Sequence, residues 1–276
     1  MNVAIIGCGY VGSSVSRYWS QTLGLTVTAT TTTPQRVENL EKIANRVMVV
    51  NGNDPEALKS VLHGQNTVLL SVGSKGRDPQ AYQQAYQKTA QTLATVLPQV
   101  PEVKQLIYTG SFGLYGDQNG ATVDESSPVK PSSKNHEILY KAEQILLESA
   151  SENLKVCILR LGGIYGPGRE IVKIFSRMFG TTQPGNGRYP TAWIHLDDIV
   201  GAIEFVRQNQ LEGIYNLVDN SNLTRRELID LICEKHDVPN VTWDVSQPNN
   251  RPYNVRVSNQ KIKEAGYQFI HSQTLV

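Results

Sequence analysis

The chain opens on a short apolar run that ends in a glycine-rich turn, and this feature constrains its fold more than any other. Val3 to Ile6 are apolar in succession, and residues 7–12 read G-C-G-Y-V-G, which has the spacing G-x-G-x-x-G. The apolar run predicts a buried strand, Ser13 to Thr22 predict a helix, and Leu25 to Ala29 predict a second strand. The chain therefore begins with a β-α-β unit whose first connection is a glycine turn.

Each glycine of this turn has a role that a side chain would prevent. Gly7 allows a tight turn, Gly9 lets the backbone approach a pyrophosphate, and Gly12 lets the helix pack close to the sheet. The N–H groups at the helix N-terminus then face the phosphates. We predict a dinucleotide site here, and the alternative is a purely structural glycine turn. The predicted site comprises Gly7, Cys8, Gly9, Tyr10, Val11 and Gly12.

Strand and helix patterns alternate after this unit, which predicts a parallel sheet. Further strands are expected at 47–50, 67–72, 106–109 and 156–160, and helices at 34–44, 55–62, 79–97 and 136–151. Loops are expected at 73–78 and 113–135, at the sheet edge where doubly wound folds bind ligands.

The glycine and proline content rises after Gly162, which predicts a second lobe. A helix at 197–208 and a strand at 214–218 indicate a return to the first domain. We predict an α/β fold with a Rossmann-type doubly wound parallel sheet and a smaller C-terminal substrate lobe. The Rossmann domain would comprise residues 1–165 and about 194–219, and the lobe about 166–193 and 220–276.

Composition argues against several classes of protein. A chain of 276 residues suits one such domain with a smaller lobe. A net charge of +1 with 18% charged residues gives no electrostatic footprint for nucleic acid or for an anionic membrane. Met1 leads directly into the first strand, and no apolar run is long enough to cross a bilayer, so a cytoplasmic protein is expected. Three cysteines without C-x-x-C spacing argue against a disulfide framework or a zinc site.

Several further motifs follow the glycine turn in a set order. They are TVLLSVG at 67–73, YTGSFGLYGD at 108–117, LRLGGIYGPG at 159–168, IHLDD at 194–198 and YNL at 215–217. With these motifs the chain resembles the extended short-chain dehydrogenase/reductase family, the NAD-dependent epimerase/dehydratase group, and particularly its atypical members. The resemblance runs nearly end to end. It implies a nicotinamide cofactor and a small-molecule substrate.

The resemblance also implies a tyrosine and a lysine four residues apart on one helix, together with a serine. One helical turn places the ammonium beside the phenol and brings the phenol pKa toward neutrality. Ser111 matches the family serine, but Asn135 stands at the tyrosine position and Leu139 at the lysine position. Tyr86 and Gly163 replace two asparagines of the family, the second of which lies near the sugar-nucleotide substrate. A nucleotide-sugar substrate is therefore not expected.

The end of the second strand bears on the choice of cofactor. NAD-specific relatives carry an acidic residue there, whereas this chain has Thr31. Hydroxyls of Thr31 and Thr32, with Arg36 at the start of the next helix, would suit a 2′-phosphate, so NADP is expected and NAD less so. The alternative is that these threonines only end the strand and cap the helix. By the resemblance, Asn53 and Asp54 meet the adenine, and Val72, Gly73 and Ser74 line the middle of the cofactor.

Other chemically active groups each have two interpretations. His195 is either a general acid or a structural histidine before the helix at 197–208. Lys75 and Arg77 form either a contact for an anionic substrate or a solvated loop. Gly9 to Gly12 also resemble the opening of nucleotide-sugar 6-dehydrogenases, but no cysteine lies in the glycine-rich loop that those enzymes need.

Two functions are compatible with these residues. The first is an NADP-linked oxidoreductase or epimerase with Ser111 as the catalytic candidate, in which Ser111, a water or a substrate group replaces the missing tyrosine in proton transfer. The second is a non-catalytic NADP-binding sensor. No metal site is expected, and the substrate and oligomeric state stay open.

Overall fold

A seven-stranded sheet is the largest element of the computed structural model, which describes residues 1–248 and 253–276. Its strand order is β11-β7-β5-β4-β1-β2-β3, and β3-β2-β1-β4-β5 pair in parallel. This order is that of a doubly wound Rossmann sheet, so the predicted fold class is confirmed. The strands are β1 (Asn2–Ile6), β2 (Thr26–Thr31), β3 (Arg46–Val49), β4 (Thr67–Leu70), β5 (Gln105–Ser111), β7 (Lys155–Leu161) and β11 (Gly213–Leu217).

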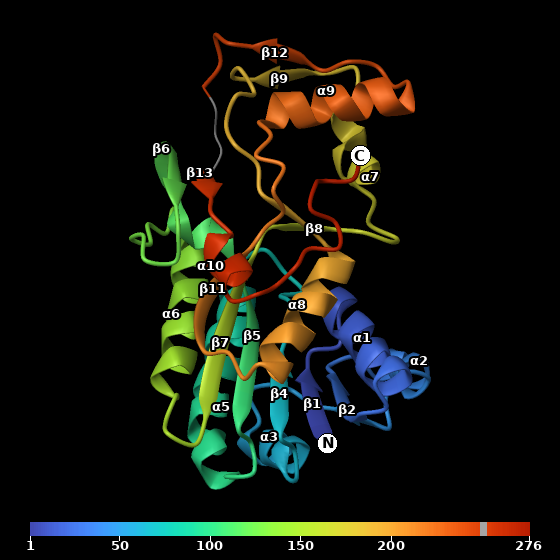
Figure 1. The fold of residues 1–276 in the computed structure, drawn as a ribbon, viewed down its shortest axis with the longest axis vertical. Coiled ribbons are helices and arrows are strands. Elements are labelled where there is room, and N and C mark those ends of the chain that lie inside the picture. The colour runs from blue at the N-terminus through green and yellow to red at the C-terminus, as the bar shows by residue number, and fades with distance from the viewer. Residues whose placement is uncertain (249–252) are drawn as a thin grey trace. The chain divides into compact units, whose positions relative to one another are not determined.

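Helices cover both faces of this sheet, because successive strand residues point to opposite sides. On one side, Ala4 and Ile6 pack with buried residues of α3 (Pro55–Leu62), α5 (Thr89–Val96) and α6 (Lys134–Glu148). On the other side, α1 (Tyr10–Arg17) lies against Ile5. Buried Trp19 follows α1 and donates from Nε1 to Oε2 of Glu204 in α8 (Leu196–Gln208) at 2.9 Å. This hydrogen bond joins the segment that follows α1 to α8, and Figure 1 shows α1 and α8 beside each other.

Side-chain caps begin three of the helices on this domain. Asp54 accepts the Ala57 N–H at α3, Asp78 accepts the Ala81 N–H at α4 (Pro79–Tyr82), and Ser133 accepts the His136 N–H at α6. Such caps satisfy backbone donors that a helix leaves unpaired. The remaining helices are α2 (Val37–Glu41), α7 (Ile171–Phe175), α9 (Arg225–His236) and α10 (Gln260–Glu264).

The chain divides into two compact units, each built from several segments. Unit 1 comprises Met1–Ser111, Ser133–Arg160 and Val200–Tyr215, and unit 2 comprises Phe112–Ser132, Leu161–Ile199 and Asn216–Val276. This division places 112–132, 161–165, 194–199 and 216–219 in unit 2, whereas the sequence assigned these residues to the Rossmann domain.

Unit 2 contains three two-stranded parallel pairings and two apolar clusters. The strands pair as β8 (Gly163–Tyr165) with β10 (Trp193–His195), β9 (Thr182–Pro184) with β12 (Thr242–Asp244), and β6 (Asp117–Val123) with β13 (Asn254–Val257). One cluster gathers residues of α7 and α9, and the other lies around Phe112, Tyr115 and Val255.

The structure corrects the prediction of a loop over 113–135. Phe112–Tyr115 form a 3-10 turn, Asp117–Val123 form strand β6, and α6 begins at Lys134. The partner of β6 is β13, which lies far along the chain, and the register between them is irregular. The exposed residues of β6 are mostly polar, and its partner strand is far along the chain. The sequence therefore shows no clear alternation of apolar and polar residues there.

Helix lengths were also predicted imperfectly. The expected helix at 34–44 is a 3-10 turn, Pro34–Arg36, followed by α2, and the helix at 79–97 is interrupted by a π-helical stretch, Gln83–Lys88.

In the described part of the chain, no helix has both the length and the apolar composition needed to cross a membrane.

Candidate functional site

The glycine turn between β1 and α1 has two glycines that the fold requires and one that faces open space. Gly7 has φ +93°, and a Cβ there would lie 2.6 Å from the carbonyl oxygen of Ser71. A Cβ on Gly12 would overlap the carbonyl oxygen of Gly7. A Cβ on Gly9 would meet no atom within 4 Å. Gly9 therefore borders a space that the protein itself leaves unfilled.

The N-terminus of α1 begins at this open space. Gly9 is the N-cap residue, and in the described structure no side chain caps the helix. Because the first N–H groups of a helix lack partners within it, an anion is a natural partner for them. The turn thus fits a dinucleotide pyrophosphate.

Thr30 and Ser13 hold the turn in place. The N–H of Gly7 donates to Thr30 Oγ1 at 3.0 Å, and the N–H of Cys8 donates to the Thr30 carbonyl at 2.9 Å. Ser13 Oγ donates to the Cys8 carbonyl at 3.1 Å. Burial raises the pKa of the Cys8 thiol to about 12, so Cys8 stays neutral and serves the turn rather than nucleophilic chemistry. Of its neighbours, Val11 is buried and Tyr10 is half-buried.

The segment after β2 places the positively charged side chain of Arg36 beside the glycine turn. Arg36 Nη2 donates to Ser13 Oγ at 3.2 Å, which places the guanidinium beside the first turn of α1. Thr31 is buried, and its Oγ1 accepts the Thr33 N–H at 3.1 Å, while Thr32 is exposed. The Thr31 hydroxyl therefore shapes the turn after the strand, and Arg36 is the basic group that the structure brings to the site.

Asn53 and Asp54, after β3, have different partners. The Asp54 carboxylate accepts the Ala57 N–H at 3.0 Å and so caps α3. Asn53 Nδ2 donates to Gln84 Oε1 at 2.7 Å, whereas its buried Oδ1 has no hydrogen-bond partner among the residues that the structure describes. A buried amide oxygen without a donor fits the amino group of an adenine, so Asn53 is the better candidate of the two.

The loop after β4 contains Val72, Gly73 and Ser74. Val72 packs against the sheet cluster, and a Cβ on Gly73 would meet no atom within 4 Å. Ser74 Oγ donates to the Gly76 carbonyl at 2.7 Å, which closes the loop on itself. Gly73 is thus a second position in unit 1 where the backbone borders open space.

Ser111 ends β5, and Asn135 and Leu139 lie one turn apart on α6. Asn135 Nδ2 donates to the Arg77 carbonyl at 2.8 Å, so the amide connects α6 to the loop after β4. Within the described residues, the buried Asn135 Oδ1 has no hydrogen-bond partner. Ser111, Asn135 and Leu139 are all half-buried. The structure therefore offers a serine and an amide at these positions, and α6 contains no tyrosine with a lysine four residues later.

Tyr86, which replaces a family asparagine, lies against the loop after β4. A hydrogen bond from the Ser74 backbone reaches the Tyr86 hydroxyl, and burial raises the Tyr86 pKa above its usual value. Its ring lies 5.2 Å from that of Tyr82, centroid to centroid. The phenol is therefore a hydrogen-bond donor at neutral pH rather than a base. Tyr86 stands where the family has an asparagine, and this replacement is the sequence feature that could have pointed to it.

Unit 2 contains a cavity of about 200 Å³, which is lined by the positively charged side chain of Arg225 and by aromatic rings. Arg225 lies over the Phe175 ring, 5.0 Å from its centroid. The buried Trp193 Nε1 has no hydrogen-bond partner in the part of the chain that the structure describes. A Cβ on Gly163 would lie 2.6 Å from the Trp193 ring, so the indole takes the space that the family's asparagine would need. The cavity is lined by Gly163, Ile174, Phe175, Thr191, Ala192, Trp193, Arg225 and Tyr253.

Comparison with known proteins identifies the family. The profile of the NAD dependent epimerase/dehydratase family matches residues 3–217. The chain belongs to this family. Among curated relatives, Protein YeeZ of Escherichia coli K12 is 31% identical over 225 residues, which cover 78% of this chain and 76% of that protein. The family assignment confirms the resemblance found in the sequence motifs.

Solved structures of other proteins share the fold. A functionally unknown conserved protein from Silicibacter pomeroyi matches with a TM-score of 0.78 and 24% identity, covering 99% of this chain and 95% of that one. UDP-glucose 4-epimerase from Thermotoga maritima matches with a TM-score of 0.79 and 22% identity, covering 96% and 92%. At these identities the likeness extends to the fold, and the choice of substrate depends on this chain's own residues.

Proposed function

We propose that this epimerase/dehydratase family member is an NADP-linked oxidoreductase or epimerase acting on a small molecule. The observation that carries the cofactor choice is Arg36, which donates to Ser13 beside the glycine turn while Thr31 stands where NAD-specific relatives have an acid. A guanidinium pairs well with a phosphate, and the absence of a carboxylate at Thr31 removes a repulsive charge.

Different residues of unit 1 would bind different parts of the cofactor. Gly7 to Gly12 would hold the pyrophosphate, Arg36 the 2′-phosphate, and Asn53 the adenine. The bound nicotinamide would supply hydride transfer, which needs mainly positioning from the protein. Ser111 would donate its hydroxyl hydrogen to the substrate oxygen. Because no tyrosine–lysine pair is present, the base would be a water or a substrate group.

The cavity of unit 2 supports a substrate smaller than a nucleotide sugar. Its volume of about 200 Å³ is below the roughly 300–1,000 Å³ of pockets for larger ligands. Arg225 and the Trp193 N–H are its available donors, and the Trp193 ring takes the place of the family asparagine. We therefore propose a small substrate with an anionic group.

Turnover tests this proposal. The purified protein should oxidise or reduce small carboxylate-bearing alcohols, aldehydes or ketones with NADP(H), and not nucleotide sugars. Ser111→Ala should then lower kcat by at least about a hundredfold with cofactor affinity unchanged. Ser149→Ala, at the far end of α6, is the control. Tight NADP binding without turnover on any of these substrates would favour the second candidate, a non-catalytic NADP sensor, which Asn135 and Leu139 at the catalytic positions support.

Two glycine variants separate binding from folding. Gly9→Ala should lower the unfolding free energy less than Gly7→Ala does, because its φ of −78° is negative and its Cβ position is open; its ψ of −145° lies outside the regions that alanine favours, so some cost remains. The same variant should weaken cofactor binding at least tenfold, about 1.4 kcal/mol, because the methyl group enters the proposed pyrophosphate space. Gly7→Ala should instead destabilise the fold, since it adds a Cβ overlap at positive φ. Urea unfolding and calorimetry check both, and unchanged cofactor binding in Gly9→Ala would remove the pyrophosphate from this turn.

A further inference from the structure

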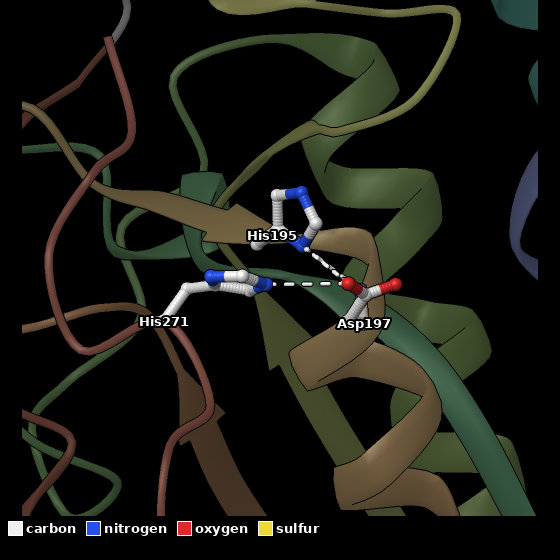
Figure 2. A group of neighbouring side chains, drawn as sticks. All are labelled: His195, Asp197 and His271. Carbon is white, nitrogen blue, oxygen red and sulfur yellow. Dashed lines mark hydrogen bonds and ion pairs between the residues drawn. The ribbon is translucent and has the colours of Figure 1, made fainter.

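Two histidines and one aspartate converge in unit 2, and none of them is among the proposed cofactor residues. His195 ends β10, Asp197 lies in the first turn of α8, and His271 lies in the C-terminal segment after α10. His195 Nδ1 lies 3.4 Å from Asp197 Oδ2, and His271 Nε2 lies 3.2 Å from the same oxygen. Figure 2 shows both imidazoles directed at one carboxylate.

These spacings suit the ligand shell of a small cation. A tetrahedral Zn²⁺ site with bonds of about 2.0–2.1 Å has ligand atoms about 3.3–3.4 Å apart. Two edges of the cluster already have this length, and all three ligand atoms lie within 4.8 Å of one another. Imidazole nitrogen and carboxylate oxygen are a donor set that borderline divalent ions prefer.

The lone pair of His195 faces the cluster. Its Nδ1 accepts the Asp197 N–H at 3.2 Å, so the ring proton is on Nε2, and a metal ion bound at Nδ1 would replace this N–H at the lone pair. A neutral imidazole is the form that binds a metal.

A surrounding shell fixes the position of His271. The fully buried Asp198 carboxylate accepts the Ile270 N–H at 2.6 Å, the His271 N–H at 2.9 Å and the Tyr267 hydroxyl at 3.2 Å. The Tyr165 ring packs edge-on against His195, with centroids 5.1 Å apart. Metal ligands are typically oriented by such outer contacts.

We propose that His195, Asp197 and His271 bind a divalent transition metal ion, with Zn²⁺ as the chemical type. The Asp197 side chain is 53% exposed, which leaves a fourth position to water. The ion would fasten the C-terminal segment to the start of α8. That segment also contacts Asp219 through Thr274 Oγ1, and Tyr165 through the Leu275 N–H. The site was not predicted from the sequence, because His271 lies far along the chain from His195 and Asp197 and no cysteine is among the ligands.

Zn²⁺ titration of chelator-stripped, tag-free protein tests the proposal. Calorimetry should show one equivalent bound, and Co²⁺ in place of Zn²⁺ should give visible absorption of a tetrahedral site. Asp197→Asn and His271→Gln should each weaken binding by more than the roughly 10–100-fold that loss of an outer contact costs. In wild type, Zn²⁺ should also slow amide hydrogen exchange across Tyr267–Val276.

A second histidine–carboxylate pair provides the matched control. His63 Nδ1 lies 3.3 Å from Glu102 Oε1 on unit 1, without a third ligand in the described structure. His63→Gln should leave the Zn²⁺ affinity unchanged. The proposal is overturned if wild type binds no Zn²⁺, if Asp197→Asn and His271→Gln bind it as wild type does, or if exchange in Tyr267–Val276 is unaffected by the ion.

Discussion

Glu143→Gln should destabilise the protein by about 3–5 kcal/mol. Glu143 of α6 and Arg160 of β7 are 0% and 2% exposed, and they form a bidentate pair. Arg160 Nη2 donates to Glu143 Oε1 at 2.5 Å, and Arg160 Nε donates to Oε2 at 3.1 Å. The substitution removes the negative charge that Glu143 places beside the buried guanidinium, and this cost exceeds that of the lost hydrogen bonds.

A double variant distinguishes a buried ion pair from simple packing. Glu143→Leu with Arg160→Met removes both charges and should cost far less than Glu143→Gln in urea unfolding. Lys134→Ala breaks an exposed ion pair with Glu137 on the same helix, and its unfolding midpoint should hardly move. If the double variant is as unstable as Glu143→Gln, the charges are not the cause of the loss.

Arg36→Ala should weaken NADP binding about ten- to hundredfold and leave NAD binding nearly unchanged. A charge-assisted contact to the 2′-phosphate is worth roughly 1.5–3 kcal/mol, and NAD has no such phosphate. Arg36 is half-buried and is directed at Ser13, so its guanidinium is already positioned beside the glycine turn.

Calorimetric titration of both cofactors checks this expectation. Arg17→Ala removes an exposed positive charge from the last turn of α1 and controls for net charge. It should alter neither affinity. Equal losses of NADP and NAD affinity in Arg36→Ala would show that Arg36 supports the turn rather than the 2′-phosphate.

The central sheet could be predicted because its strands are apolar, consecutive and bounded by turn residues. All seven predicted strands of the sheet are present, with ends shifted by a few residues. Helix α3 could be placed because Asp54 and Pro55 mark its beginning. Strand β6 could not, because its partner β13 is distant and its residues are mostly exposed.

The candidate site was predictable where one residue type is required by local geometry. Gly7 at positive φ and Gly12 against the Gly7 carbonyl are such positions. The packing of Trp193 on Gly163 could not be predicted from the sequence, because these two residues come into contact only through the pairing of β8 with β10. Asp54 was assigned to the adenine, but its carboxylate is the cap of α3, and a sequence does not distinguish those two uses.

Calorimetric titration of the unmodified protein with NADP and with NAD tests the central claim most directly. The account predicts one dinucleotide per chain and an affinity for NADP at least tenfold higher than for NAD, about 1.4 kcal/mol. Equal affinities, or tighter binding of NAD, would contradict the role given to Thr31 and Arg36. Binding of neither would contradict the dinucleotide site itself.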